Sequence, residues 1–353
     1  MSTQLPTIGK IPPEAFSEYI YPHLGALQDG VLFGPQSGGD VGVVRVAHGI
    51  VMESTTDPVF VVPQYGWDRV AWFAVNILES DEATSDLPPN LMTVDLNLPW
   101  PMSTEDFSHF WQAWDRTIKQ LGITIISGHT ARYEGCNFPM VGGTTVMGIG
   151  PEDQYMTPNM ARPSDFLLCI KGSTIETTGL FAAIFSEWIR RELGDAGYEA
   201  ADRLFDQMSV VEDARQVASV GVRQQGVIAM HDAAECGVIG GVHEIVECSR
   251  VGIELWEDHV LICPEVKAVT ARLGIDPLIA ISEGTLLFTV TEDAVDRVTP
   301  LLAHQIDAGV IGRVIGIDEG RWRIKNGVRQ PLVHPGVDPF WEAFGHLVER
   351  GAR

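Results

Sequence analysis

The chain has 353 residues, of which 45% are hydrophobic and 20% are charged, and its formal net charge is −23. This length exceeds what one hydrophobic core usually supports, so we expect two domains. No apolar run approaches the roughly 18 residues of a membrane span, and the negative charge would repel phosphate backbones, so we expect neither a membrane nor a nucleic acid as a partner.

The first half of the chain alternates strand-like and helix-like segments. Strands are predicted over residues 41–47, 50–53, 91–98, 123–126 and 140–149, and a helix over 67–78. A second helix, with Ser103 as its cap and Asp106 in its first turn, carries aromatic residues at helical spacing: Phe107, Phe110, Trp111 and Trp114. This stripe is typical of a helix that packs on a core rather than of a cofactor site.

A polar passage from Gly150 through Pro163 separates this half from a second series of strands and helices. Strands are predicted there over 165–170, 286–290, 310–317 and 321–325, and helices over 180–193, 238–248, 264–273 and 293–304. Two mixed α/β (α+β) layers of similar size are therefore expected. We place an N-terminal domain at 1–155, a C-terminal domain at 160–335 and a tail at 336–353.

Two further features concern the compartment and the thiols. Residues 1–11 lack the basic start and apolar core of a secretory signal, which predicts a cytoplasmic protein. The five cysteines are scattered and include no C-x-x-C pair, which argues against a disulfide framework and against structural zinc. Cys236 interrupts a glycine-rich turn beside an acidic motif, so it is either a small apolar filler or a participant in the chemistry.

The usual nucleotide-binding loops are missing. Neither G-x-x-x-x-G-K-[ST] nor G-x-G-x-x-G occurs, which removes the main support for a P-loop enzyme and for a dinucleotide-binding domain. The segment 34–40 offers another device, a flexible loop whose amides, including those of Gly38 and Gly39, could wrap phosphate oxygens while Asp40 meets a metal ion. The alternative for Asp40 is an ordinary turn former.

Three carboxylates follow three apolar segments of the first half: Asp40, Asp57 and Asp81. A magnesium nucleotide needs several oxygen ligands from separate segments, so we predict these three as metal ligands and as contacts to Mg-ATP. Each has a structural alternative, because Asp57 precedes a proline and Asp81 could end the helix that starts at residue 67.

Polar signatures also mark two later positions. Gly128 and His129 follow the predicted strand 123–126, where Gly128 could contact the nucleotide and His129 could donate to a phosphate or to a metal-bound water. A satisfied structural role is the alternative for His129. In the second half His231 and Asp232 open another glycine-acid turn, and Asp232 is counted with the predicted catalytic residues.

Together these segments resemble the aminoimidazole-ribonucleotide synthase-related superfamily, whose fold is called PurM-like. The similar segments are 34–44, 55–57, 74–76 with 80–81, 127–132, 230–241 and 249–254. The resemblance implies a mixed N-terminal sheet that pairs in a homodimer to form a barrel, and a C-terminal α/β domain. It also implies Mg2+ and ATP as cofactors, and a small substrate whose amide or carbonyl oxygen is phosphorylated, or a direct kinase-type transfer.

The resemblance also assigns residues. It places Asp40, Asp57 and Asp81 among the metal and phosphate contacts, converging across a subunit contact, with the loop 34–39 over the triphosphate. His129 stands where many relatives have Asp or Glu, so the metal site of this chain is either preserved or rearranged. Arg132 is the best cation near the presumed phosphates, its alternative being a surface arginine.

The hydrogenase-maturation carbamoyl dehydratase branch is the most similar part of the superfamily, over residues 251–255, 264–266 and 282–284. That branch ends in a cysteine that carries the reacting group, whereas this chain ends in Arg353, so carrier chemistry on a tail thiol is not expected. Glu235 stands where the branch has an arginine, and a carboxylate should repel an anionic substrate group rather than bind it.

Two functions therefore stay open. The first is an ATP-dependent enzyme that activates an oxygen of a small substrate by dehydration, ligation or phosphorylation chemistry. The second is a nucleotide-binding maturation or scaffold partner with reduced catalysis, which His129 and Cys236 motivate. A weaker third idea is a transition-metal hydrolase built on His129, His231 and Asp232.

Overall fold

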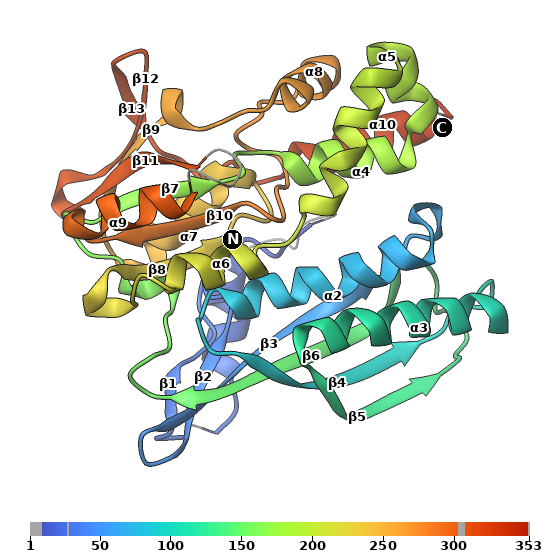
Figure 1. Ribbon diagram of the computed structural model, residues 1–353, viewed down its shortest axis with the longest axis horizontal. Coiled ribbons are helices and arrows are strands. Elements are labelled where there is room, and N and C mark those ends of the chain that lie inside the picture. The colour runs from blue at the N-terminus through green and yellow to red at the C-terminus, as the bar shows by residue number, and fades with distance from the viewer. Residues whose placement is uncertain (1–8, 27, 303–307, 352–353) are drawn as a thin grey trace.

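The computed structural model describes residues 9–26, 28–302 and 308–351. Parts of three expected segments lie outside the described residues: residues 1–8 of the segment considered for a secretory signal, residues 303–304 of the helix expected over 293–304, and residues 352–353 of the tail. The chain forms two α/β domains, one above the other in Figure 1, each built on a mixed sheet. The expected two-domain class is confirmed.

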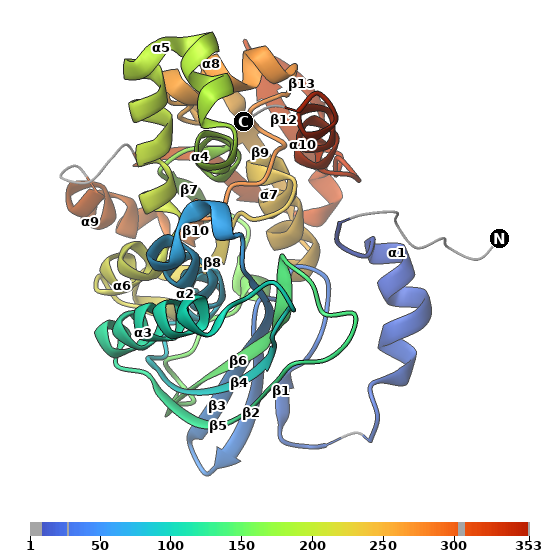
Figure 2. The ribbon, with the colours of Figure 1, turned by 90° about the vertical axis from the view of Figure 1, so that its right-hand side faces the viewer.

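The first domain contains a sheet with the strand order β1-β2-β3-β6-β4-β5, in which β4 and β5 run parallel and the other neighbours antiparallel. Its strands are β1 (Val31–Phe33), β2 (Gly42–Ala47), β3 (Ile50–Phe60), β4 (Pro89–Asn97), β5 (Thr124–Ala131) and β6 (Met140–Pro151). Helices α2 (Trp67–Ala83) and α3 (Thr104–Leu121) cover one face of this sheet. The short α1 (Pro13–Ala15) and the helical turns after it stand beside the sheet (Figure 2).

Helix α3 forms as its sequence predicts. The Ser103 hydroxyl accepts a hydrogen bond from the Asp106 amide at 3.0 Å, and the Asp106 carboxylate accepts one from the Ser103 amide at 3.0 Å, which together make a capping box. Phe110 and Trp114 are fully buried in the core of the first domain. The aromatic stripe is therefore core.

Two strands are longer than the sequence predicts. β3 runs to Phe60 instead of residue 53, and β5 runs to Ala131 instead of residue 126. Polar residues suggested strand ends at both places, but pairing with β6 and with β4 continues the hydrogen-bond ladders through them. As a result Asp57 and His129 lie within strands rather than after them.

The second domain has the strand order β13-β12-β9-β11-β7-β10-β8, in which β12 and β9 run parallel and the other neighbours antiparallel. The strands are β7 (Phe166–Ile170), β8 (Val227–Asp232), β9 (Gly252–Trp256), β10 (Leu286–Val290), β11 (Ala308–Ile315), β12 (Arg321–Lys325) and β13 (Val328–Pro331). Alternate residues of β7 enter opposite cores: Leu167 and Cys169 face one core, and Leu168 and Ile170 face the other.

Helices cover both faces of this second sheet. α7 (Gly237–Ser249) packs on one face, and α6 (Val211–Ala218) and α9 (Glu292–Leu302) pack on the other. A third cluster joins α4 (Ile175–Ile184), α5 (Ser186–Arg203), α8 (Pro264–Leu273) and α10 (Pro339–Glu349). The single helix expected over 180–193 is two helices, because the backbone leaves the helical conformation at Phe185. The expected tail contains α10, whose Phe340 is buried against Phe181.

Helix α2 joins the two domains. Its Phe73 packs with Phe205 of the second domain, and its Ser80 hydroxyl accepts a hydrogen bond from the Val210 amide at 3.1 Å. The end of α2, where Asp81 lies, is thereby placed against the second domain. Within the described ranges, no helix combines the length and the hydrophobicity that crossing a membrane requires.

Candidate active site

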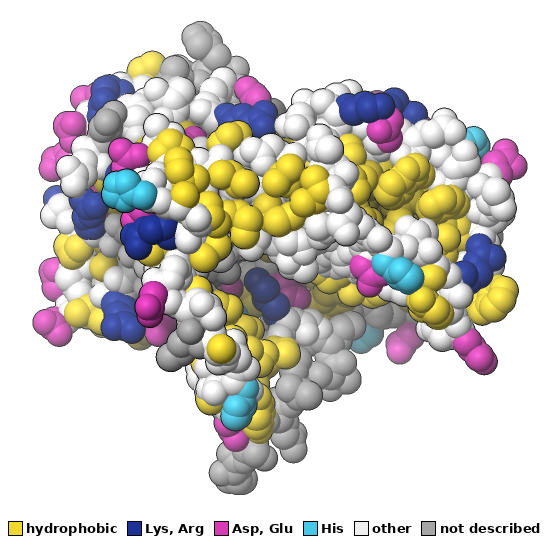
Figure 3. All heavy atoms as spheres, turned by 90° about the horizontal axis from the view of Figure 1, so that it is seen from below, with side chains coloured by type: hydrophobic (Ala, Val, Ile, Leu, Met, Phe, Trp, Pro, Cys, Tyr) yellow, Lys and Arg dark blue, Asp and Glu magenta, His cyan; other side chains and the backbone are white. Residues whose placement is uncertain are grey.

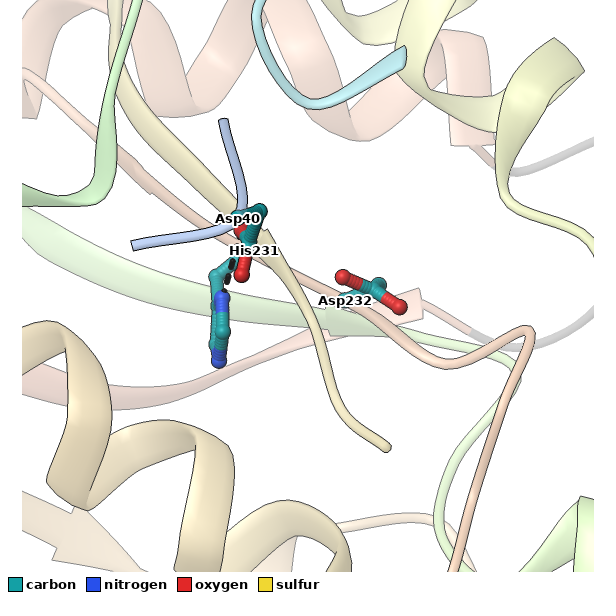
Figure 4. Close-up of side chains that lie close together, drawn as sticks. All are labelled: Asp40, His231 and Asp232. Carbon is teal, nitrogen blue, oxygen red and sulfur yellow. Dashed lines mark hydrogen bonds and ion pairs between the residues drawn. The ribbon is translucent and has the colours of Figure 1, made fainter. Parts of the chain in front are cut away.

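The site starts from contacts between residues almost two hundred positions apart. Asp40 lies just before β2, and His231 and Asp232 end β8 of the other domain. Asp40 Oδ2 and His231 Nδ1 are 2.7 Å apart. One ligand atom from each of Asp40, His231 and Asp232 lies within 4.8 Å of the others (Figure 4). The site therefore spans both domains of one chain.

His231 is held from both sides. Its Nε2 lies 2.9 Å from Oε2 of Glu244 on α7, while its Nδ1 contacts Asp40. The ring is 3% exposed, and the two carboxylates raise its pKa well above the usual value against the opposing effect of burial. Because the charged ring is hydrogen-bonded on both sides, it fixes the orientation of the Asp40 carboxylate on the side of Asp232.

Asp57 and Asp81 belong to the same group of carboxylates. Asp81 Oδ2 accepts a hydrogen bond from the Thr55 hydroxyl at 3.0 Å, and Asp57 lies two residues beyond Thr55 on the same side of β3. Burial raises the pKa of Asp81 well above its usual range, and Asp232, Asp57 and Asp40 raise it further. Burial also raises the pKa of Asp57 to about 6, with Asp232 and Asp40 adding to the shift. These mutual effects place the four aspartates in one electrostatic cluster, which we call the acidic site.

Glu283 extends the acidic site on the side of the second domain. Its amide donates to Oε2 of Glu176 at 2.8 Å, and burial together with Asp232 raises the pKa of the Glu283 carboxyl well above its usual value. Its Oε1 is buried, with no hydrogen-bond partner among the residues that the structure describes. Sequence reasoning did not assign Glu283 or Glu244 to the site, although the turn 282–284 carried part of the resemblance.

The glycine-rich loop lies beside the acidic site. Gly38 has φ +75°, and a Cβ at this position would lie 2.6 Å from the backbone oxygen of Glu244 on α7. Only glycine allows this close approach without a shift of the backbone. Gly39 is exposed and directly precedes Asp40. The loop thus runs between α7 and the first of the site aspartates.

Gly128, His129 and Arg132 lie elsewhere. β5 is separated from β3 by β6 and β4, which puts the His129 and Asp57 backbones roughly 14 Å apart at the usual strand spacing. His129 Nε2 contacts the Tyr133 hydroxyl at 2.9 Å, and Arg132 donates to the Met102 carbonyl at 2.6 Å. A Cβ on Gly128 would meet the Val94 carbonyl at 2.7 Å, so packing against β4 explains that glycine.

These positions bear on two expectations. The structure groups the four aspartates within one chain, and their convergence across a subunit contact stays a prediction. Within one chain, the hydrolase site expected from His129, His231 and Asp232 does not form, because His129 lies on β5 and contacts Tyr133, whereas His231 and Asp232 lie at the end of β8.

Cys236 is a poor nucleophile in this structure. Its side chain is 2% exposed, and burial raises the pKa of its thiol to about 12, so the thiolate is scarce at neutral pH. Its backbone has φ +63° and its amide donates to Asp338 Oδ2 at 2.6 Å, which links α7 to the start of α10. The interpretation as a structural filler fits these contacts.

The acidic site fits a magnesium ion by its donor set. Carboxylate oxygens are the ligands that this hard cation prefers, and Asp40, Asp57, Asp81 and Asp232 bring them from four separate segments. The raised pKa values of Asp40, Asp57 and Asp81 come partly from repulsion between carboxylates, which a divalent cation would offset.

Comparison with known proteins identifies the family of both domains. The model of the N-terminal domain of AIR synthase related proteins matches residues 38–150, and the model of the C-terminal domain matches residues 162–325. Carbamoyl dehydratase HypE of Escherichia coli is 26% identical over 299 residues, which cover 83% of this chain and 85% of that protein.

Two solved structures show the same fold. The hydrogenase maturation protein HypE in complex with ATP has a TM-score of 0.65 at 18% identity, covering 92% of this chain and 93% of that one. AaThiL complexed with AMPPCP and TMP has a TM-score of 0.64 at 20% identity, covering 83% and 89%. The chain therefore belongs to the AIR synthase-related superfamily, with the PurM-like fold, and is similar to its HypE-like branch.

Proposed function

We propose that this chain is an enzyme that uses Mg-ATP to phosphorylate an amide or carbonyl oxygen of a small substrate. One observation carries the proposal: Asp40, Asp57, Asp81 and Asp232 converge from both domains on one acidic site. Similar proteins include a HypE structure with ATP and a ThiL structure with an ATP analogue, which supports adenine nucleotide chemistry on this fold.

Each part of the site has a task in this proposal. Asp40, Asp57 and Asp81 would hold the magnesium ion, which when bound screens the triphosphate and polarises its terminal phosphoryl group. His231, bonded to Asp40 and Glu244, keeps the Asp40 carboxylate aimed at the site. Asp232 reaches the same site from the second domain and could add a further carboxylate to it. The amides of the loop 34–39 are the proposed phosphate cradle.

We further propose a homodimer that forms through the first sheet. Strand residues of this sheet expose large apolar side chains, namely Val46 at 52%, Ile126 at 55%, Met140 at 46% and Ile149 at 40%. Figure 3 shows a band of hydrophobic side chains across the face seen from below, the side on which this sheet lies in Figure 1. A second copy would cover this band. The same contact could bring Gly128, His129 and Arg132 of one copy to a nucleotide bound by the other.

Replacement of one ligand tests the enzymatic proposal. Asp81→Asn keeps the size of the side chain and removes its charge, so we expect Mg-dependent ATP consumption with small amide substrates to fall by at least about a hundredfold. Asp115→Asn is the matched control, because Asp115 lies on α3 in an exposed ion pair with Lys119. Equal activity of the Asp81 variant and the wild type would contradict the assignment.

A binding partner without its own chemistry is the second candidate, favoured by the placement of His129 on a separate strand from the acidic site. Calorimetry with ATP and Mg2+, paired with the same consumption assay, separates the two. Tight binding without turnover on any amide would favour the partner, whereas turnover that depends on Asp81 would favour the enzyme.

A further inference from the structure

Lys10 reaches the acidic site from the start of the described chain. Its Nζ lies 3.9 Å from Glu244 Oε1, and Glu244 contacts His231, which in turn contacts Asp40. The Lys10 side chain is 68% exposed, whereas that of Glu244 is 18% exposed. The ammonium group therefore stands on the solvent side of the acidic site, where an entering ligand meets it.

The backbone of Lys10 is held by the second domain. Its amide donates to the Glu235 carboxylate at 3.1 and 3.3 Å, and Nε1 of Trp341 donates to the same carboxylate at 3.3 Å. A Cβ on Gly9 would lie 3.4 Å from both Glu235 and Trp341, which is van der Waals contact, so this part of the backbone lies against both side chains. Glu235 thus anchors the segment that carries the ammonium group.

The charge of Lys10 acts on the whole acidic site. Glu244 raises its pKa most, and Asp81, Asp40 and Asp232 raise it further. Lys10 in turn lowers the pKa of Asp57 against the effect of burial. These effects place the ammonium group near every proposed magnesium ligand, although it forms a short contact with none of the four aspartates among the described residues.

We propose that Lys10 binds the terminal phosphate of ATP and that Glu235 and Trp341 position it for this contact. This inference rests on the proposed function. An exposed lysine ammonium is a compact cation with three donors and a flexible stem, which suits a phosphate that arrives and leaves. Glu235 stands where the HypE-like branch has an arginine, which argued against binding of an anionic substrate group. In this chain Glu235 instead holds the segment that carries the Lys10 ammonium group.

The proposed contact between Lys10 and the terminal phosphate predicts that loss of Lys10 weakens the binding of ATP more than that of ADP. A charge-assisted contact to the terminal phosphate should make Lys10→Met bind Mg-ATP at least about tenfold more weakly, while binding of Mg-ADP changes little. Lys119→Met removes the same charge from the exposed face of α3 and should leave both affinities unchanged. Calorimetry on the full chain, with circular dichroism as a folding check, gives all of these values.

Two further measurements separate this role from simple neutralisation of the aspartates. Without nucleotide, Lys10→Met should bind Mn2+, measured by electron paramagnetic resonance, more tightly than the wild type, because a competing cation is gone. Glu235→Ala keeps the ammonium group but releases its anchor, so its preference for ATP over ADP should lie between those of the wild type and of Lys10→Met.

The outcomes are distinct. An unchanged preference for ATP over ADP in Lys10→Met, with wild-type protein that binds Mg-ATP, overturns the role of Lys10 and leaves the proposed function standing. Wild-type protein that binds no adenine nucleotide overturns the proposed function, and this inference with it. A selective loss of ATP affinity supports both.

Discussion

Asp40 and Asp57 have carboxyl groups whose acidity is set by their surroundings. Burial raises the pKa of each to about 6, and for Asp40 the nearby His231 partly offsets this shift. A protonated carboxyl is a poor ligand for a divalent cation, so Asp40 and Asp57 would serve as the proposed ligands only as the pH rises through this value. The proposed site should therefore depend on pH.

The affinity for Mg-ATP should therefore rise with pH. We expect binding at pH 7.5 to be at least about tenfold tighter than at pH 5, as calorimetry at a series of pH values can measure. Asp57→Asn has one titrating ligand fewer, so its affinity should be weaker throughout and should change less steeply. A slope as steep as that of the wild type would mean that Asp57 does not titrate with the site.

At the scale of elements, β3 and α2 bury acids between them. Glu53 on β3 and Glu79 and Glu82 on α2 are fully buried, and the carboxyl oxygens of Glu79 have no hydrogen-bond partner within the ranges that the structure describes. A Cβ on Gly148 of β6 would lie 2.5 Å from Glu82 Oε1 and 2.6 Å from Glu53 Oε1, so this glycine makes room for the two acids. Burial raises the pKa of Glu53 to about 8, so it is largely protonated at neutral pH.

This contact should make the stability of the fold depend on pH. Because the folded-state pKa of Glu53 lies above the usual value of 4.5, the free energy of unfolding should fall as the pH rises from about 5 toward 9. Glu53→Gln cannot ionise and should lose at least about 1 kcal/mol less over this range than the wild type. Urea denaturation at pH 5 and pH 9 tests this, with the exposed Glu105→Gln as control; parallel losses in all three proteins would contradict it.

At the scale of the whole molecule, the sheets of the two domains differ in how their faces are covered. The first sheet is covered by α2 and α3 on one face and exposes apolar side chains on its strands, whereas the second sheet is covered on both faces. Exposed apolar patches of this kind often mark a protein interface. The uncovered sheet is thus the natural place for contact between two copies.

A charge placed on this sheet should separate the copies. Ile126→Asp on β5 is expected to shift the protein from dimer to monomer in sedimentation velocity, because an aspartate buried in an apolar contact is costly. Val328→Asp is the matched control, since Val328 is 56% exposed on β13 of the other domain, close to the 55% of Ile126. A wild-type monomer, or a dimer that both variants preserve, would argue against this interface.

Local patterns predicted much of the fold. The capping box at Ser103, the aromatic stripe of α3 and the bounds of α8, β10 and β12 follow from spacing and end signals within a few residues. Strand ends were less predictable, because the extent of β3 and β5 depends on pairing with distant strands that no local pattern contains. The same limit applies to α4 and α5, where local spacing predicts a single helix over residues 180–193.

The sequence by itself determined the two-domain class and the superfamily, and it predicts the three aspartates of the first half as site residues, since all of these depend on short motifs and on their order. Only the tertiary structure decided which residues join those aspartates. Asp232 is already named from its motif, whereas Glu244, Glu283 and Lys10 join because α7, the turn before β10 and the start of the described residues meet there. His129 is left out because β6 and β4 stand between β5 and β3. Contacts across hundreds of residues arise from packing of whole domains, which local periodicity does not encode.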